Sequence, residues 1–196
     1  MPIRLFLSTA AVALLLAAPA VAPAQTMQNQ AAAPQMTTNA GQQLSKQDQK
    51  FMKEAATGGM AEVKLGELAQ QNAQDDQVKQ FGAKMVQDHG QANQKLQQIA
   101  SEKGVQLPTQ VDKKHEQLYD RLSKLQGPAF DRAYMSAMVK DHNQDVKAFK
   151  HAQQTVKDPD LKQFAQQTLQ VIEQHDQIAK NVDHSLTATG SSRKSR

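Results

Sequence analysis

The chain has 196 residues and no cysteine, which excludes disulfides, thiolate metal ligands and a lipid-anchored cysteine. Aromatic residues make up 4% of the chain and Trp is absent, so aliphatic side chains, Met and a few Phe must form any core. The net charge is +4, but four of the 23 basic residues lie near the two ends of the chain. The other 19 balance the 19 acidic residues. The basic residues near the ends are Arg4, Arg193, Lys194 and Arg196. We therefore expect no nucleic-acid partner, because nucleic-acid binding needs a concentrated basic face.

Residues 1–24 have the pattern of a cleaved export signal. Arg4 precedes an apolar run over residues 5–18, and the small residues at 22–24 suit cleavage before Gln25. The run is shorter than the roughly 20 apolar residues that span a bilayer. We expect a periplasmic or secreted protein with no transmembrane span in the mature chain, either free or peripheral to the outer membrane. A retained signal anchor is the alternative.

The rest of the chain predicts one all-α domain between two disordered segments. Residues 25–44 are rich in Gln, Ala, Thr, Asn and Pro and have no apolar period, which predicts a linker. Residues 188–196 are predicted to be a disordered basic tail. Between them, over residues 45–187, start and stop signals bound helices with a 3.6-residue apolar period, and no strand pattern occurs. The predicted helices cover about residues 46–73, 76–104, 111–125, 129–156 and 159–186.

Short segments in the two halves of the chain resemble each other. Residues 85–89 and 138–142 both read Met-Val-x-Asp-His, and Phe81 and Phe164 each follow a Lys-Gln pair. These matches suggest two paired helical hairpins.

Each of the four long helices carries one metal-capable side chain on its apolar stripe, near the middle of the helix. The four residues are Glu62, His89, His142 and His175. A buried Glu or His costs free energy unless it is paired, hydrogen-bonded or bound to a metal. One such residue per helix at similar heights predicts a shared site in the centre of a four-helix bundle. A structural polar layer without a ligand is the alternative.

Three imidazoles and one carboxylate suit a single ion of Zn, Fe, Mn, Cu or Ni better than calcium, which prefers oxygen ligands. Four protein ligands would close the site, whereas three plus water would leave room for chemistry. Asp88 and Asp141 each precede a candidate ligand by one residue. They point about 100° away around the helix, so each could orient a His on a neighbouring helix. Solvation or pairing with Lys is the alternative for both.

Three segments carry a resemblance to a known family. They are residues 51–66, the two Met-Val-x-Asp-His segments, and the helix over residues 164–179 that holds His175. Together they resemble DUF4142, a family of exported bacterial proteins of unknown function in the ferritin-like superfamily, over about residues 45–187. The resemblance implies a ferritin-like four-helix bundle in which residues 104–127 form a long crossover with a short extra helix.

The resemblance does not extend to ferritin chemistry. Di-iron carboxylate bundles use two inward Glu plus two Glu-x-x-His motifs. This chain has one inward Glu and no Glu-x-x-His motif. Iron storage, ferroxidase and oxygenase activities are therefore not expected.

Functions from different classes remain open at this point. The first is an exported bundle protein that binds one transition-metal ion through Glu62, His89, His142 and His175. The second is a non-enzymatic structural or stress-related interaction module in the periplasm, with a protein or envelope partner and a metal-free polar layer. The third is a metal-dependent oxidoreductase with an open coordination position. The sequence therefore does not decide whether the protein is an enzyme. Its oligomeric state is likewise undefined by the sequence.

Overall fold

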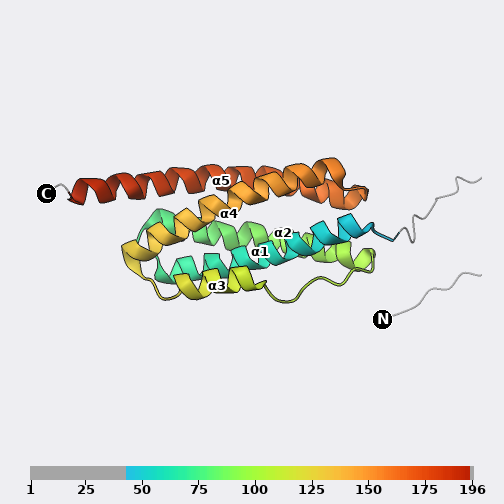
Figure 1. The fold of residues 1–196 in the computed structure, drawn as a ribbon, viewed down its shortest axis with the longest axis horizontal. Coiled ribbons are helices and arrows are strands. Elements are labelled where there is room, and N and C mark those ends of the chain that lie inside the picture. The colour runs from blue at the N-terminus through green and yellow to red at the C-terminus, as the bar shows by residue number, and fades with distance from the viewer. Residues whose placement is uncertain (1–42, 195–196) are drawn as a thin grey trace, which may run out of the picture. The chain divides into compact units, whose positions relative to one another are not determined.

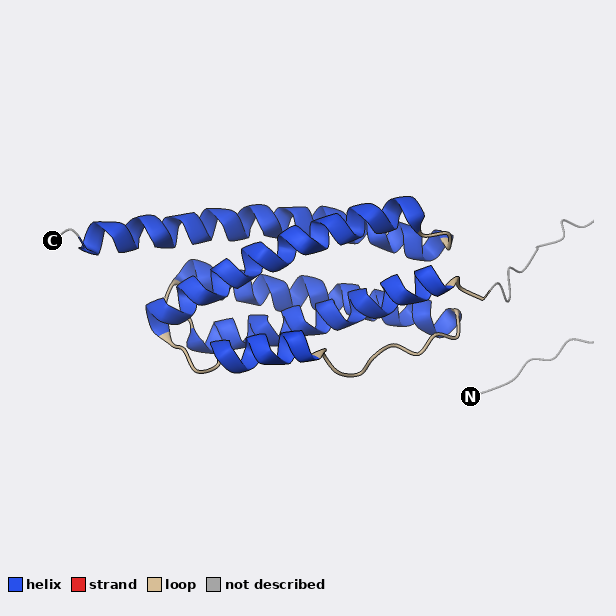
Figure 2. Ribbon diagram, in the orientation of Figure 1, coloured by secondary structure: helices blue, strands red, loops and turns tan. Residues whose placement is uncertain are grey.

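The fold was obtained as a computed structural model that describes residues 43–194, with side chains as far as residue 188. The predicted signal and the predicted linker up to residue 42 lie outside the described residues. Within the described part the chain forms five helices and no strand, which confirms the predicted all-α bundle (Figure 2). The helices are α1 (Lys46–Asn72), α2 (Asp76–Glu102), α3 (Lys113–Leu122), α4 (Gly127–Thr155) and α5 (Pro159–Lys194).

The four long helices form two antiparallel hairpins, α1 with α2 and α4 with α5 (Figure 1). The hairpins face each other through α1 against α4 and α2 against α5. The crossover between the hairpins runs along one side of the bundle and contains α3, which packs against α1 and α4. None of the helices over residues 43–194 combines the length and the apolar content that a membrane span requires.

Polar side chains cap the starts of four of the five described helices. The Ser45 hydroxyl accepts a hydrogen bond from the backbone N–H of Asp48 at 3.1 Å. Equivalent caps at the starts of α2, α3 and α5 come from Asp75, Asp112 and Asp158. A cap of this kind contributes about 1 kcal/mol of helix stability.

Two boundaries differ from the sequence prediction. Helix α5 continues to Lys194, past Leu186, where the sequence predicts its end, and into the segment predicted to be a disordered tail. The sequence places Gly190 beyond the helix end, but a single Gly lowers helix stability by about 1 kcal/mol without ending the helix. At the other end, Leu44 belongs to the predicted linker, yet it is buried in the core.

Two buried aspartates tie each hairpin to the turn of the other hairpin. Asp48, at the start of α1, accepts hydrogen bonds from the backbone N–H groups of residues 157 and 158 in the α4–α5 turn, at 3.3 and 3.2 Å. Asp131, at the start of α4, accepts hydrogen bonds from residues 74 and 75 in the α1–α2 turn, at 3.0 and 3.1 Å. Hydrogen bonds to an ionised acceptor are stronger than neutral ones. We call these two residues the aspartate clamps.

A single offset along the chain relates the two hairpins, so that α1 corresponds to α4 and α2 to α5. The equivalent pairs include Asp48 and Asp131, Asp75 and Asp158, Phe81 and Phe164, and Glu62 and Asp145. The clamps and the helix caps therefore occur at matching positions in both halves. The two Met-Val-x-Asp-His segments lie on α2 and α4, which are not equivalent helices, so that match does not come from this repeat.

Helices α1 and α2 approach each other closely at two glycines. A Cβ atom added to Gly66 would lie 2.5 Å from the carbonyl oxygen of Gly82, and one added to Gly82 would lie 2.8 Å from the carbonyl oxygen of Gly66. Both distances are shorter than van der Waals contact allows, so only glycine fits at this crossing.

The bundle core consists of two apolar clusters with polar groups between them. One cluster surrounds Phe81, Phe130 and Tyr134, and the other surrounds Met52, Leu96 and Phe164. The buried polar side chains Glu62, His142 and His175 belong to neither cluster and expose 0% of their surface. The candidate site is therefore held from both ends by close-packed apolar side chains.

The glycine crossing gives a first prediction. Gly66→Ala should destabilise the protein by about 1–3 kcal/mol, because the new methyl group forces the two backbones apart. Gly90→Ala on α2 is the matched control, since no heavy atom lies within 4 Å of its added Cβ. It should stabilise the protein by about 0.5–1 kcal/mol through helix propensity. Urea unfolding measures both changes, and equal midpoints for the two variants would contradict the close approach.

Candidate metal centre

Three imidazoles from three helices converge at the centre of the bundle. They are His89 on α2, His142 on α4 and His175 on α5, and all three are buried. Their ring centroids lie 5.3–6.0 Å apart. One nitrogen of each ring lies within 4.8 Å of a nitrogen of the other two. One ion bonded to each ring at about 2.0–2.1 Å requires nitrogens no more than about 4.2 Å apart, so small side-chain movements would complete the site.

Each of these rings keeps one nitrogen free for a ligand. His142 donates from Nδ1 to the carbonyl oxygen of Met138 at 3.0 Å, which leaves Nε2 without a partner. His175 donates from Nε2 to Asp88 at 2.7 Å, which leaves Nδ1 without a partner. The Nε2 atom of His89 is also buried and unpaired. The hydrogen bonds of His142 and His175 fix both ring orientation and tautomer, as in protein metal sites.

All three rings are held in the neutral form that binds metals. Burial, followed by the two neighbouring imidazoles, lowers the pKa of His89 to about 3. Burial and the nearby His175 lower the pKa of His142 to about 4. The pKa of His175 is also lowered by burial, although Asp88 opposes the shift. At neutral pH no proton has to leave these rings before a metal binds.

The imidazole site packs against Phe81 and lies next to a groove that is open to solvent. The ring of Phe81 lies 5.9 Å from His142 and 6.4 Å from His175, between ring centroids. A groove of about 390 Å³ between α2 and α5 is lined by Asp88 and His89. A metal ion could enter or exchange along this groove.

A second group of potential ligands lies beside the imidazoles. It consists of Glu62 on α1 with Asp141 and Asp145 on α4, and one oxygen of each carboxyl group lies within 4.8 Å of the others. No N–H group or hydroxyl of another residue donates a hydrogen bond to either oxygen of Glu62. We call these three residues the carboxylate group. The Glu62 Oε1 atom lies 3.9 Å from Nδ1 of His142, so the two groups of ligands adjoin each other.

The carboxyl groups differ in their environment. Burial and the charge of Asp141 raise the pKa of Glu62 well above its usual range, and they raise the pKa of Asp145 to about 7. Burial also acts to raise the pKa of Asp141, but His115 and Lys114 beside it hold the pKa below its usual range. Their nitrogen atoms lie 3.8 Å and 3.2 Å from its oxygens. Asp141 is therefore the member of the carboxylate group that stays ionised at neutral pH.

Comparison with known proteins places the chain in a family. A profile described as "Domain of unknown function (DUF4142)" matches residues 33–182. The chain belongs to the DUF4142 family. No curated protein matches it. Among solved structures, "Crystal structure of DUF305 fragment from Deinococcus radiodurans" is similar, with a TM-score of 0.66 and 12% identity over 73% of this chain and 99% of the other. At this level of identity the likeness shows the fold alone.

In this DUF4142 protein the residues predicted from the sequence divide between two groups. His89, His142 and His175 meet as expected, whereas Glu62 is grouped with Asp141 and Asp145. The assignment of all four as metal ligands remains a prediction.

The two aspartates that were predicted to orient a His differ in the residues that they contact. Asp88 holds a His of a neighbouring helix, His175, and pairs with Lys84 at 2.9 Å as well. Asp141 contacts none of the three converging imidazoles through a hydrogen bond; its partners are His115 and Lys114 in the crossover.

The DUF4142 chain also contains a site residue that sequence reasoning missed. Asp145 lies three residues after His142 and four after Asp141, so it shares their face of α4. That spacing was the available signal. The adjacent residues, Gln144 and Val146, do not distinguish Asp145 from a solvated aspartate.

The buried neutral histidines make the free energy of unfolding depend on pH. The unfolded chain takes up a proton near pH 6.5, whereas His89 in the folded, metal-free protein does so only near pH 3. This residue therefore contributes stability at neutral pH that is lost as the pH falls below 6.5. Relative to His89→Met, the wild type should lose about 3 kcal/mol between pH 6.5 and pH 4. Urea unfolding with a chelator present measures the difference, and a pH-independent difference would contradict a buried neutral ring.

Proposed function

We propose that this protein is an exported helical bundle that binds one transition-metal ion through His89, His142 and His175. The observation that carries the proposal is that three buried imidazoles from three helices converge and that each ring retains an unpaired nitrogen. An unsatisfied buried acceptor costs about 1–3 kcal/mol. A bound ion would satisfy all three at once. Export rests on residues 1–24 and remains a prediction from the sequence.

The internal repeat favours this proposal over a metal-free polar layer. In the other half of the repeat, the positions equivalent to His142, His175 and His89 are Gly59, Ala92 and Ile172. Those three residues, together with His89, line a cavity of about 90 Å³. The helices pack there with no imidazole at the three equivalent positions, so this architecture does not require His at these positions to set the helix register.

The donor atoms favour zinc or copper among the candidate ions. Neutral imidazole suits Zn²⁺, Cu²⁺, Fe²⁺ and Ni²⁺; among these ions affinity is highest for copper, and sites with three His ligands are typical of zinc. Three protein ligands are typical of sites that keep a fourth position for water or another small molecule. The groove at Asp88 and His89 gives a route to that position.

Metal analysis tests the proposal directly. The mature protein, purified without a His tag and stripped with a chelator, should bind one Zn²⁺ or Cu²⁺ per chain. Excess metal at about 100 times the Kd should add about 2.7 kcal/mol to the free energy of unfolding. Identical thermal melting with and without each candidate metal would overturn the proposal.

Substitutions locate the ion. His89→Ala and His175→Ala should each abolish stoichiometric binding, whereas His151→Ala, at an exposed position on α4, should bind as the wild type does. Asp88→Asn should weaken binding about 10- to 100-fold, because His175 loses the carboxylate that orients it. Isothermal titration measures each affinity, and circular dichroism checks that each variant is folded. Equal binding by the His89 and His151 variants would place the ion elsewhere.

The groove also supports a second candidate, a metal-dependent oxidoreductase. A fourth coordination position that solvent can reach could bind peroxide or superoxide. The metal-loaded protein should then consume one of these substrates at a rate that falls to background in His89→Ala. Absence of turnover by the fully loaded wild type would eliminate this candidate and leave the metal-binding proposal intact.

A further inference from the structure

The carboxylate group draws its oxygens from both hairpins. Asp141 and Asp145 are one turn apart on α4, and Glu62 reaches them from α1. Glu62 and Asp145 occupy equivalent positions in the internal repeat, which explains why they meet at mid-height of the bundle. Asp141 has Gly58 as its equivalent, so the third carboxylate is present on one side only.

Glu62 is the feature that points to a ligand. Its side chain exposes none of its surface, and it lies against the two aspartates of α4. Both of its oxygens are buried, and no N–H group or hydroxyl of another residue donates a hydrogen bond to them. An ionised carboxylate in this position is strongly unfavourable, so in the absence of a cation Glu62 is protonated, as its raised pKa indicates, and shares its proton with Asp141. A cation bound between the carboxyl groups would replace that proton and coordinate the buried oxygens.

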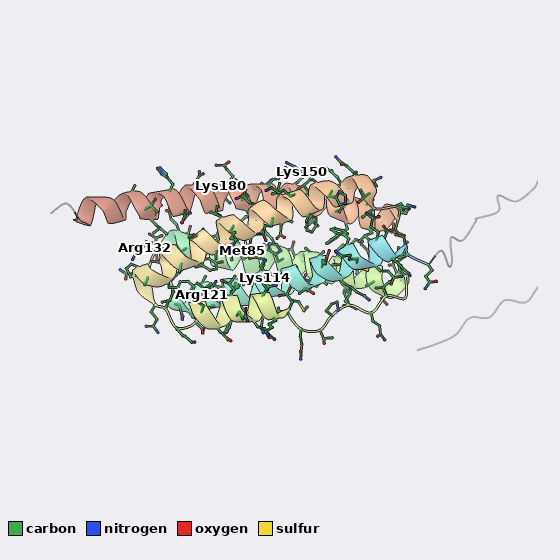
Figure 3. The ribbon with its side chains drawn as sticks, in the orientation of Figure 1. Met85, Lys114, Arg121, Arg132, Lys150 and Lys180 are labelled. Atoms are coloured by element: carbon green, nitrogen blue, oxygen red, sulfur yellow. The ribbon has the colours of Figure 1, made fainter. Side chains whose placement is uncertain are left out.

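A cation can reach the carboxylate group from solvent without passing the imidazoles. A surface pocket of about 270 Å³ between α1, α3 and α4 is lined by Asp141, Asp145 and His115. Lys114 in α3 lies beside this pocket, on the side of the bundle where the crossover packs (Figure 3). The pocket therefore opens away from the groove between α2 and α5 that leads to His89.

One basic side chain, Lys114, already pairs with one member of the carboxylate group. The Lys114 ammonium lies 3.2 Å from Asp141 and 3.3 Å from the amide oxygen of Gln144. Its side chain is 60% exposed, so it can move into solvent at little cost. A divalent ion bound by several carboxylates should displace it.

We propose that Glu62, Asp141 and Asp145 form a second cation site, for a hard divalent ion of the Mn²⁺ class. Carboxylate and amide oxygens are the ligands that Mg²⁺, Ca²⁺ and Mn²⁺ prefer, whereas imidazole nitrogens favour zinc and copper. The oxygen separations of up to 4.8 Å fit an ion bound about 2.0–2.5 Å from each oxygen. The site is independent of the imidazole site, although His142 lies against both.

Manganese titration of the zinc-loaded protein tests this site. With the imidazoles occupied by Zn²⁺, added Mn²⁺ should bind once per chain and lose the sharp electron paramagnetic resonance spectrum of the free aqueous ion. Asp145→Asn, which is nearly isosteric, should weaken Mn²⁺ binding at least about tenfold. Asp120→Asn is the matched control, because this aspartate is exposed on α3 and outside the site. Mg²⁺ and Ca²⁺ added as competitors should displace Mn²⁺ from the wild type.

Two further variants separate Mn²⁺ binding at the carboxylate group from the imidazole site and from general effects on folding. Lys114→Met removes the competing ammonium and should tighten Mn²⁺ binding, an effect that a purely structural role of the carboxylates would not produce. His175→Ala should lose zinc but keep manganese, so failure of the imidazole site leaves this test intact. Absence of Mn²⁺ binding by the wild type, equal affinity in Asp145→Asn and the control, or loss of Mn²⁺ in His175→Ala would each overturn the proposal.

Discussion

The centre of this bundle is governed by the cost of burying polar atoms that have no partner. Such an atom costs about 1–3 kcal/mol, and three imidazole nitrogens and both Glu62 oxygens are in this condition. The apolar clusters on either side hold these atoms in place. Charged side chains such as Lys150 and Lys180 lie on the outer side of the α4–α5 hairpin, where they form ion pairs with Glu173 and Asp176 (Figure 3). The molecule therefore concentrates its unsatisfied polar atoms inside, where a cation would satisfy them.

The sequence predicted which face of each helix turns inward, because a period of 3.6 residues fixes a face. His89, His142 and His175 are buried for that reason. The period does not fix which inward residues of different helices meet, since that depends on the axial shift and rotation between helices. Glu62 lies 3.9 Å from His142 and also faces Asp141 and Asp145. The apolar period alone therefore does not show whether the four predicted residues share one site or belong to two adjoining groups.

Buried acids were the hardest feature to predict. Asp48 and Asp131 lie in the first turns of their helices, where an acidic side chain usually interacts with its own helix N-terminus and with water. Here both are buried, because their partners are backbone N–H groups of turns far away in the sequence. No local pattern distinguishes such an aspartate from a solvated one. The offset that pairs Asp48 with Asp131 is visible in the sequence, but its meaning depends on knowing which turn each carboxylate reaches.

The aspartate clamps have a consequence for how the molecule can come apart. Each hairpin carries the carboxylate that closes the other hairpin's turn, so neither half is complete alone. A chain cut within the crossover would give two fragments, each with unsatisfied backbone donors that only the other fragment can accept. Reassembly of the fragments would restore both turns together. The imidazole triad takes one ring from the first hairpin and two from the second, so it would exist only in the reunited pair.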